Sequence, residues 1–308
     1  MKKLIITAAL CGSLPTKEQN PSVPITPDEL ARDALACYQA GASVVHIHAR
    51  DKAGKNCHDT AVFQEIHDKV KALAPELIVQ LSTGDRAGMS FESRRACLFV
   101  NPEMASLSTG SVNFPTSVYE NSPELITQLA EMMHERHIMP EIEVFDTSMI
   151  APAIDLKKKG LIDGPLYLNF VMGMRNIQPA TLGQLSHLLS MLPTDALWSI
   201  SGVGASQVTT VLMGLAAGGN IRVGLEDNLY QYRGVLASNV SLVERVVRLA
   251  RETGREIATP AEAREILKAA RDGRNKVSQP VYTNTDREYD GQKPDIYVSY
   301  EHSALQYG

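Results

Sequence analysis

Short apolar stretches alternate with longer amphipathic segments along most of this chain, and this alternation constrains the fold more than any other feature. The apolar stretches have the length of buried strands, and the segments between them are long enough for helices. This order predicts parallel strands joined by crossover helices. The expected strands cover residues 4–9, 44–48, 78–82, 104–108, 141–145, 166–170, 198–201 and 221–224.

Several helices have recognisable beginnings and ends. Thr26 and Glu29 are spaced as a capping box with proline at the first helical position, and a second Thr-Pro box at Thr259 opens a later helix. Ser122 precedes another proline in the same way. Gly41 occupies the position after the first helix that favours glycine.

Eight strand–helix units in 308 residues predict an α/β protein with one domain over residues 1–308, a (β/α)8 TIM barrel. An open doubly wound sheet fits less well, because no Gly-x-Gly-x-x-Gly follows the first strand. The polar segment from about 275 to 308 is expected to be a C-terminal extension that packs on the barrel or on a neighbouring subunit, with a disordered tail as the alternative.

Composition and charge exclude several classes of partner. The chain has 30 Lys and Arg against 35 Asp and Glu, and its formal charge of −5 gives no support to a groove that binds nucleic acid. No apolar run approaches the roughly 20 residues that a membrane helix needs. The first apolar run lacks a convincing cleavage site, and the four cysteines form no CxxC pair. We therefore expect a soluble cytoplasmic protein with no nucleic-acid or membrane partner.

Six of the expected strands carry polar residues at every second position. Alternate residues of a barrel strand face the axis or the surrounding helices, and the apolar face must meet the helices. The polar faces therefore point to the axis, where an ordinary barrel interior is apolar and an unpaired charge is costly. The ionisable residues on these faces are His46, His48, Arg50, Glu141, Glu143, Arg222 and Glu226.

His46 and His48 lie on one face of the second strand, so both imidazoles can reach one ion. Glu226 lies just past the eighth strand, which a closed barrel separates from the second strand by roughly 10 Å of backbone. Two imidazoles, one carboxylate and an open position are typical of a catalytic metal site. We expect Zn2+, although the same ligands also serve ferrous iron and other divalent ions.

Arg222 and Asp227 flank this candidate metal site. A contact between them would hold the Asp227 carboxylate as a general base for a carbon acid, and a structural ion pair is the alternative. Glu143 is a candidate for substrate binding or proton transfer. Glu141 and Glu143 are alternatively partners of Arg50 or Arg222.

Two loops are candidates for binding an anion. Ser82, Thr83 and Gly84 follow the third strand, where hydroxyl and N–H groups can bind a carboxylate. The segment 202–206, with Gly202, Gly204 and Ser206, follows the seventh strand at the position where TIM barrels often bind phosphate. An ordinary glycine-rich helix start is the alternative for this second loop.

At these residues the chain resembles the β-keto acid cleavage enzymes, the family that includes 3-keto-5-aminohexanoate cleavage enzyme. The resemblance covers essentially the whole barrel. The motifs that carry it are Thr7-Ala8-Ala9, Pro24-Ile25-Thr26-Pro27, Val45-His46-Ile47-His48-Ala49-Arg50-Asp51, Ser82-Thr83-Gly84, Ser106-Leu107-Ser108-Thr109-Gly110-Ser111-Val112-Asn113-Phe114, Glu141-Ile142-Glu143-Val144-Phe145-Asp146 and Arg222-Val223-Gly224-Leu225-Glu226-Asp227-Asn228.

The resemblance implies a zinc-dependent TIM barrel, usually a homo-oligomer with a tetramer favoured, that converts a β-keto acid and acetyl-CoA into acetoacetate and a new acyl-CoA. It implies that His46, His48 and Glu226 bind zinc and that Asp227 and Arg222 form the base dyad. Ser82, Ser106 and Glu143 would contact the substrate. A CoA phosphate is expected near residues 202–206.

The chain departs from the family pattern at two positions that bear on the substrate. Asp85 stands where a second glycine is expected after Ser-Thr-Gly, and Leu14 stands in the first loop where members acting on amino substrates carry an acid; Glu18 is the nearest acid. A neutral β-keto acid is therefore at least as compatible as an amino-bearing one. Two other hypotheses remain open, a CoA-independent metal-dependent aldolase or hydrolase and an inert ligand-binding barrel or metal sensor.

Overall fold

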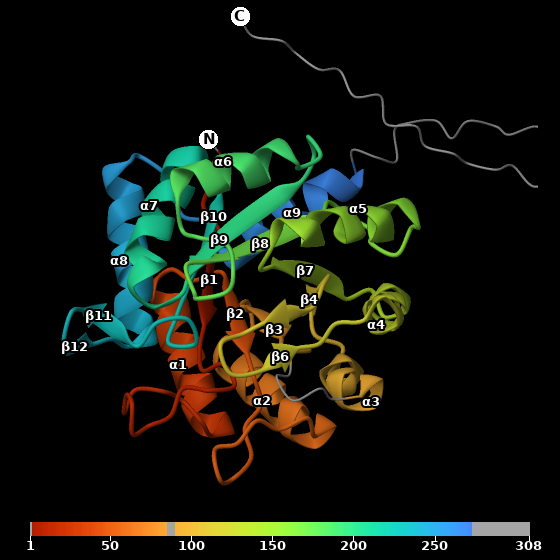
Figure 1. The fold of residues 1–308 in the computed structure, drawn as a ribbon. Coiled ribbons are helices and arrows are strands. Elements are labelled where there is room, and N and C mark those ends of the chain that lie inside the picture. The colour runs from red at the N-terminus through yellow and green to blue at the C-terminus, as the bar shows by residue number, and fades with distance from the viewer. Residues whose placement is uncertain (1, 85–89, 273–308) are drawn as a thin grey trace, which may run out of the picture.

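The chain forms a closed barrel of eight parallel strands surrounded by helices, as the sequence predicts (Figure 1). The computed structural model describes residues 2–84 and 90–272, so Asp85 and the predicted tail lie outside the described residues. Around the barrel the order is β1-β10-β9-β8-β7-β4-β3-β2. The strands are β1 Ile6–Ala9, β2 Val44–Ile47, β3 Ile78–Leu81, β4 Met104–Ser108, β7 Met139–Val144, β8 Tyr167–Met172, β9 Leu197–Gly202 and β10 Asn220–Val223.

Helices follow most strands, and several begin where the sequence indicates. Thr26 and Glu29 form the predicted capping box of α1, and Gly41 ends that helix with a left-handed φ of 118°. The Ser122 side chain caps α4 at the backbone N–H of Leu125. The helices are α1 Pro27–Ala40, α2 Thr60–Leu73, α3 Phe91–Arg94, α4 Pro123–Glu135, α5 Ile150–Lys158, α6 Leu182–Ser190, α7 Gln207–Ala217, α8 Asn239–Glu252 and α9 Pro260–Asp272, with short 3-10 turns at η1 Ala96–Val100, η2 Thr147–Met149 and η3 Gly204–Ser206.

Two small hairpins interrupt the strand–helix alternation. One consists of β5 Val112–Asn113 and β6 Val118–Tyr119, and it lies between β4 and α4. The other consists of β11 Tyr230–Tyr232 and β12 Val235–Leu236, and it lies between β10 and α8. Both therefore extend from the carboxyl ends of barrel strands, where TIM barrels carry their functional loops.

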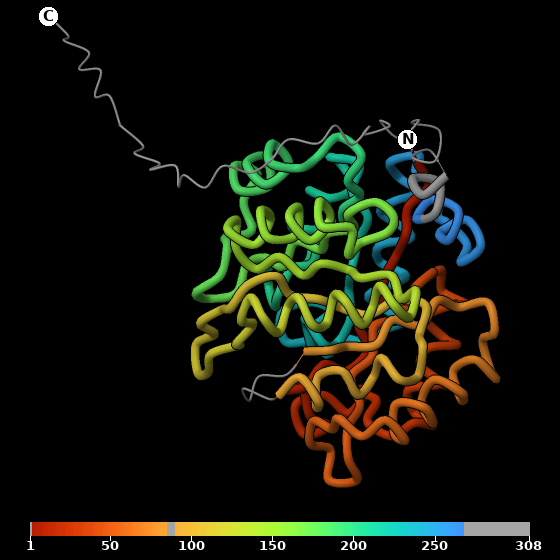
Figure 2. The backbone as a smooth tube through the Cα atoms, turned by 90° about the vertical axis from the view of Figure 1, so that its right-hand side faces the viewer, coloured from red at the N-terminus to blue at the C-terminus, as the bar shows by residue number. Residues whose placement is uncertain are grey.

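Helix α9 closes the opposite, amino-terminal end of the barrel. Its Ala263 and Leu267 side chains belong to a buried cluster with barrel residues such as Ile5, Val44 and Tyr167. Figure 2 shows this last described helix beside the start of the chain, where Leu4 bridges to Ile257. This mainly apolar cluster fills the amino-terminal end of the barrel.

Further along the axis the interior becomes polar, as the strand faces predict. Gln80, Glu141, Asn169 and Ser199 are all fully buried. Within the described residues, no helix combines the length and apolarity needed to span a bilayer.

Candidate active site

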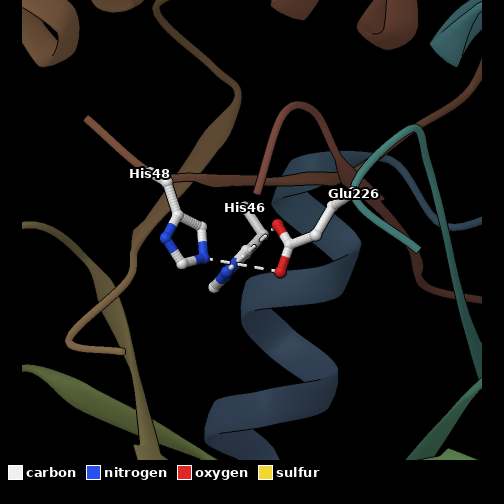
Figure 3. A group of neighbouring side chains, drawn as sticks. All are labelled: His46, His48 and Glu226. Atoms are coloured by element: carbon white, nitrogen blue, oxygen red, sulfur yellow. Dashed lines mark ion pairs between the residues drawn. The ribbon is translucent and has the colours of Figure 1, made fainter. Parts of the chain in front are cut away.

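His46, His48 and Glu226, called the metal triad below, meet at the carboxyl end of the barrel (Figure 3). Their ligand atoms all lie within 4.8 Å of one another. Nε2 of His48 is 3.4 Å from one carboxylate oxygen of Glu226, and Nε2 of His46 is 3.6 Å from the other. Two ligand atoms on one tetrahedral Zn2+ would lie about 3.3 Å apart, given bonds of about 2.0 Å. The triad thus needs little movement to share an ion.

The polar atoms of the triad are better suited to bind a cation than to form hydrogen bonds with one another. Nε2 of His46 and Oε2 of Glu226 are buried and have no hydrogen-bond partner among the described residues. Burial lowers the pKa of His46 to about 3, so its imidazole is neutral and offers a lone pair. Neutral imidazoles and a carboxylate are ligands that zinc and similar divalent ions prefer.

Strand order explains how residues so distant in sequence meet. Strand β1 separates β2 from β10, and its Thr7 is paired with Arg222 while its Ala9 is paired with His46. These small β1 side chains leave space over the strand for the larger side chains of its neighbours. The predicted separation of two strand spacings is therefore confirmed.

Two glycines allow the Glu226 side chain to lie close to His46 and His48. Gly224 has a φ of 154°, and a Cβ atom there would lie 2.0 Å from the carbonyl oxygen of Ala9. Gly12 in the first loop has a φ of 58°, and a Cβ atom there would lie 2.7 Å from Cγ of Glu226. Only glycine permits both close approaches.

Arg222 is buried beside the triad and contacts three carboxylates. Its guanidinium lies 3.0 Å from Glu143, 2.7 Å from Glu226 and 3.0 Å from Asp227. The predicted Arg222–Asp227 pair is confirmed, and of the two predicted glutamate partners Glu143 is the one that contacts Arg222. The cluster of these four residues has a formal charge of −2, which a divalent cation would balance.

The two neighbouring acids Glu226 and Asp227 differ in pKa. Burial opposes the ionisation of Glu226, but Arg222 and the two imidazoles outweigh it and hold the pKa well below its ordinary value. Burial raises the pKa of Asp227 to about 6, because Arg222 offsets only part of the penalty and Glu226 adds repulsion. Asp227 can therefore both accept and return a proton near neutral pH.

A cavity of about 400 Å³ opens above the triad and the Arg222 cluster. Phe114, Tyr119 and Phe145 form an aromatic wall on one side, with ring centroids of Phe114 5.5 Å from Phe145 and 5.9 Å from Tyr119. The β5–β6 hairpin supplies two of these rings. Leu14 and Leu229 add apolar surface elsewhere. The sequence does not predict this wall, since nothing in the spacing of the hairpin residues relates them to the barrel axis.

The three residues predicted after strand β3, together with Ser106 of β4, which the resemblance implies as a substrate contact, divide into two groups. Ser82 and Gly84 line the cavity. Thr83 and Ser106 do not belong to the described lining, and instead bond to each other, with the Thr83 hydroxyl donating to the Ser106 carbonyl at 2.7 Å. Their position indicates that they fix the loop that carries Ser82 and Gly84.

The predicted 202–206 loop lies at the rim of the cavity. Gly204 lines it, and its backbone N–H donates to the carbonyl of Asp227 at 2.8 Å. Gly202 is packed against the first turn of α7, where a Cβ atom would lie 2.7 Å from Cα of Gln207. Ser206 lies against Gly173 and is not among the described lining residues.

Arg50 and Glu141 do not pair with each other. The Arg50 guanidinium instead donates to four backbone carbonyls, those of Cys11, Gly12, Pro15 and Gly54. It therefore holds the first loop against the barrel. Glu141 accepts hydrogen bonds from Gln80 and Ser199 deeper in the interior. The polar alternation of strands β3 and β7 points to these buried residues, but it does not specify their partners.

The fold and the site define a TIM-barrel protein whose His-His-Glu triad, at the carboxyl end of the barrel, has ligand atoms that suit a divalent metal ion. The family model described as "beta-keto acid cleavage enzyme" matches residues 3–268. The chain belongs to this family, which confirms the resemblance found in the sequence.

Two named relatives match the chain over most of their length. The 3-keto-5-aminohexanoate cleavage enzyme of Acetoanaerobium sticklandii is 45% identical over 269 residues, 87% of this chain and 98% of that protein. The 3-oxoadipate:acetyl-CoA acetyltransferase of Cupriavidus necator is 43% identical over 267 residues, 85% of this chain and 94% of that protein. Among solved structures, ObcA in a ternary complex with a C4-CoA adduct and oxalate superposes with a TM-score of 0.73 at 25% identity, covering 80% of this chain and 67% of that one.

Proposed function

We propose that this chain is a β-keto acid:acetyl-CoA acyltransferase that cleaves a carbon–carbon bond and depends on a divalent metal, with zinc favoured. The observation that carries the proposal is that the metal triad and the Arg222–Asp227 pair lie together at the base of one cavity, which His48, Glu226 and both members of the pair line. Two relatives whose names specify a β-keto acid and acetyl-CoA, the 3-oxoadipate and 3,5-dioxohexanoate enzymes, support it.

The overall reaction exchanges two acyl groups. A β-keto acid R–CO–CH2–COO⁻ and acetyl-CoA give R–CO–S–CoA and acetoacetate. Carbon C2 of the β-keto acid loses a proton and attacks the thioester carbonyl, which expels the CoA thiolate. The thiolate then attacks the original keto carbon, and the bond between that carbon and C2 breaks. Acetoacetate leaves after C2 regains the proton, so atoms and charge balance.

We propose that Asp227 takes and returns that proton. Its carboxylate lines the cavity, and the guanidinium of Arg222 holds both of its oxygens at 3.0 and 3.2 Å. A pKa raised by burial to about 6 suits a group that must act first as a base and then as an acid. Arg222 fixes the orientation of this carboxylate. If the Arg222–Asp227 ion pair were purely structural, Asp227→Asn would not reduce catalysis.

We propose that His46, His48 and Glu226 hold the metal. A bound divalent cation would supply a Lewis acid that polarises the keto and carboxylate oxygens of the substrate. Ser82 and Gly84 lie in the same cavity and are candidates to bind the substrate carboxylate, with Thr83 and Ser106 supporting their loop. Glu143 is a candidate to contact the substrate, because it lines the cavity beside Arg222.

Acetyl-CoA would approach from the open side of the cavity. The rim there includes Gly204, next to the start of α7, so residues 202–206 are the candidate contact for a CoA phosphate.

The test is a reaction of the purified zinc-loaded protein with a panel of β-keto acids and acetyl-CoA carrying 13C in its acetyl group. The panel includes neutral, amino-bearing and dicarboxylic substrates. The expected result is a new acyl-CoA without label, detected by mass, together with acetoacetate labelled in the two carbons from acetyl-CoA. Asp227→Asn is the matched control and should form both products about 10²- to 10⁴-fold more slowly.

Other outcomes favour the rival functions. Turnover of a β-keto acid without acetyl-CoA would contradict the transferase and support a CoA-independent aldolase or hydrolase. Tight metal binding with no turnover of any panel member would support an inert barrel or a metal sensor.

We further propose a cytoplasmic homo-oligomer, with a tetramer favoured, as the family resemblance implies. Light scattering during size-exclusion chromatography of the purified protein measures the subunit number. A monomer would contradict this part of the proposal.

A further inference from the structure

A chain of buried hydrogen bonds leads from the metal triad into the barrel interior. Nδ1 of His46 lies 2.6 Å from Oε1 of Gln80. The amide nitrogen of Gln80 donates in turn to Oε2 of Glu141, and Ser199 donates to the other oxygen of Glu141 at 3.2 Å. All four residues are fully buried, so water does not compete for these bonds.

The strand register gives this chain its path. His46 of β2 is paired with Gln80 of β3, so the two side chains leave neighbouring strands at the same level. Strand β4 separates β3 from β7, and its Ser106 is paired with Glu141. The small serine side chain leaves space for the Gln80 amide to reach Glu141.

The chemistry of the groups gives the chain a direction. An ionised carboxylate only accepts hydrogen bonds, so Glu141 requires the NH2 end of the Gln80 amide. The carbonyl end of Gln80 then faces His46 and requires a hydrogen on Nδ1. A neutral imidazole carries one hydrogen, so Nε2 of His46 is left with its lone pair. That nitrogen is the one that faces Glu226 without a hydrogen-bond partner among the described residues.

We propose that Gln80 and Glu141 form a positioning relay that holds His46 in the tautomer able to bind the metal. Because Glu141 only accepts hydrogen bonds, it fixes the orientation of the Gln80 amide. The carbonyl of that amide then fixes the hydrogen of His46 on Nδ1. Neither residue belongs to the described lining of the cavity, and Gln80 links Glu141 to the metal triad through its contact with His46. This role rests on the proposed metal site, but it predicts properties of the protein that no substrate is needed to measure.

The first measurement is the affinity for Zn2+, by competition with a chelator at pH 8.5. Burial raises the pKa of Glu141 to about 7, so its carboxyl is ionised at that pH. Gln80→Leu removes the relay and should weaken zinc binding by about 10- to 100-fold, the usual effect of losing a partner of a ligating histidine. Glu141→Gln keeps the shape but allows the amide of Gln80 to reverse, and should weaken binding on the order of 10-fold.

The matched control is Ser201→Ala. Ser201 is another buried hydroxyl of the barrel interior, and it accepts a hydrogen bond from Asn169 rather than from a relay residue. Its loss should leave zinc affinity unchanged. Thermal unfolding of each variant separates a local change at His46 from a loss of folding.

The second measurement is the tautomer of His46 in the metal-free protein, read from long-range 1H–15N correlation spectra of 15N-histidine-labelled protein. The expected spectrum has the hydrogen on Nδ1 in the unsubstituted chain and a mixture of tautomers in Glu141→Gln. If Glu141 had a purely structural role, Glu141→Gln would change the stability of the protein without changing the ratio of the two His46 tautomers. His46→Ala assigns the signal by its loss.

Two results would overturn the relay: a hydrogen on Nε2 of His46 in the unsubstituted protein, or unchanged zinc affinity in folded Glu141→Gln and Gln80→Leu. The unsubstituted protein and Glu141→Gln decide the matter if Gln80→Leu does not fold. Failure to form acyl-CoA leaves both measurements intact, so failure of the proposed function and failure of the relay are distinguishable.

Discussion

Nη2 of Arg222 lies 2.7 Å from Oε1 of Glu226, the same oxygen that approaches His48 to 3.4 Å. Arg222 also binds Asp227, so one guanidinium connects the metal triad to the candidate base. Its positive charge keeps Glu226 ionised for a metal. It also limits how far burial can raise the pKa of Asp227. Arg222 therefore couples the charge of the metal triad to the charge of the Asp227 carboxylate.

Replacing His48 by alanine should lower the amount of bound zinc. The imidazole supplies one of three protein ligands, and Glu226 and His46 alone hold a divalent ion weakly. Metal analysis of the purified variant measures the occupancy. Full occupancy would remove His48 from the set of ligands.

Asp227→Asn should lower kcat by about 10²- to 10⁴-fold, the usual contribution of a general base. The amide keeps the size of the side chain and one contact with Arg222 but cannot accept the proton. Zinc content should be unchanged, because Asp227 is not part of the triad. A variant that turns over normally would leave Asp227 with a structural role.

Gly12→Ala should weaken zinc binding by displacing Glu226. The new Cβ atom would lie 2.7 Å from Cγ of Glu226, and the positive φ adds backbone strain of about 1 to 2 kcal/mol. Gly160→Ala is the matched control, because Gly160 has a φ of 78° but nothing within 4 Å of the added atom. Chelator competition should separate the two variants. Equal zinc affinities would show that the loop moves away without disturbing Glu226.

Asp33→Asn should stabilise the protein above pH 6. Asp33 of α1 accepts a hydrogen bond from Asn239 of α8, yet burial raises its pKa to about 6 from an ordinary value of 3.8. A raised folded-state pKa means that the folded state loses stability relative to the unfolded state as pH rises from 3.8 through about 6. Asparagine avoids this cost, roughly 1 to 3 kcal/mol.

Urea unfolding at pH 4 and pH 8 measures this effect, which should be present at pH 8 and nearly absent at pH 4. Asp28 on the same helix provides the control. Its pKa is lowered by Lys69, so Asp28→Asn should be slightly destabilising at pH 8. An Asp33→Asn variant less stable than the unsubstituted protein at pH 8 would contradict the argument.

The sequence alone was sufficient to predict the barrel and the residues of the metal triad. All eight predicted strands are confirmed, with small differences at their ends. The alternation of polar and apolar residues along each strand is a local property, because the two faces of a strand meet different surroundings. His46, His48 and Glu226 could be placed together because a closed barrel brings its first, second and last strands side by side.

Only the tertiary structure decided which polar groups are partners. Glu141 and Glu143 have the same character in sequence, yet one bonds to Gln80 and the other to Arg222. Arg50 has carbonyl partners in the first loop, and the aromatic wall depends on a hairpin that no strand pattern predicts. Such contacts depend on the stagger between strands and on the paths of loops, which arise from the packing of the whole chain rather than from any local pattern.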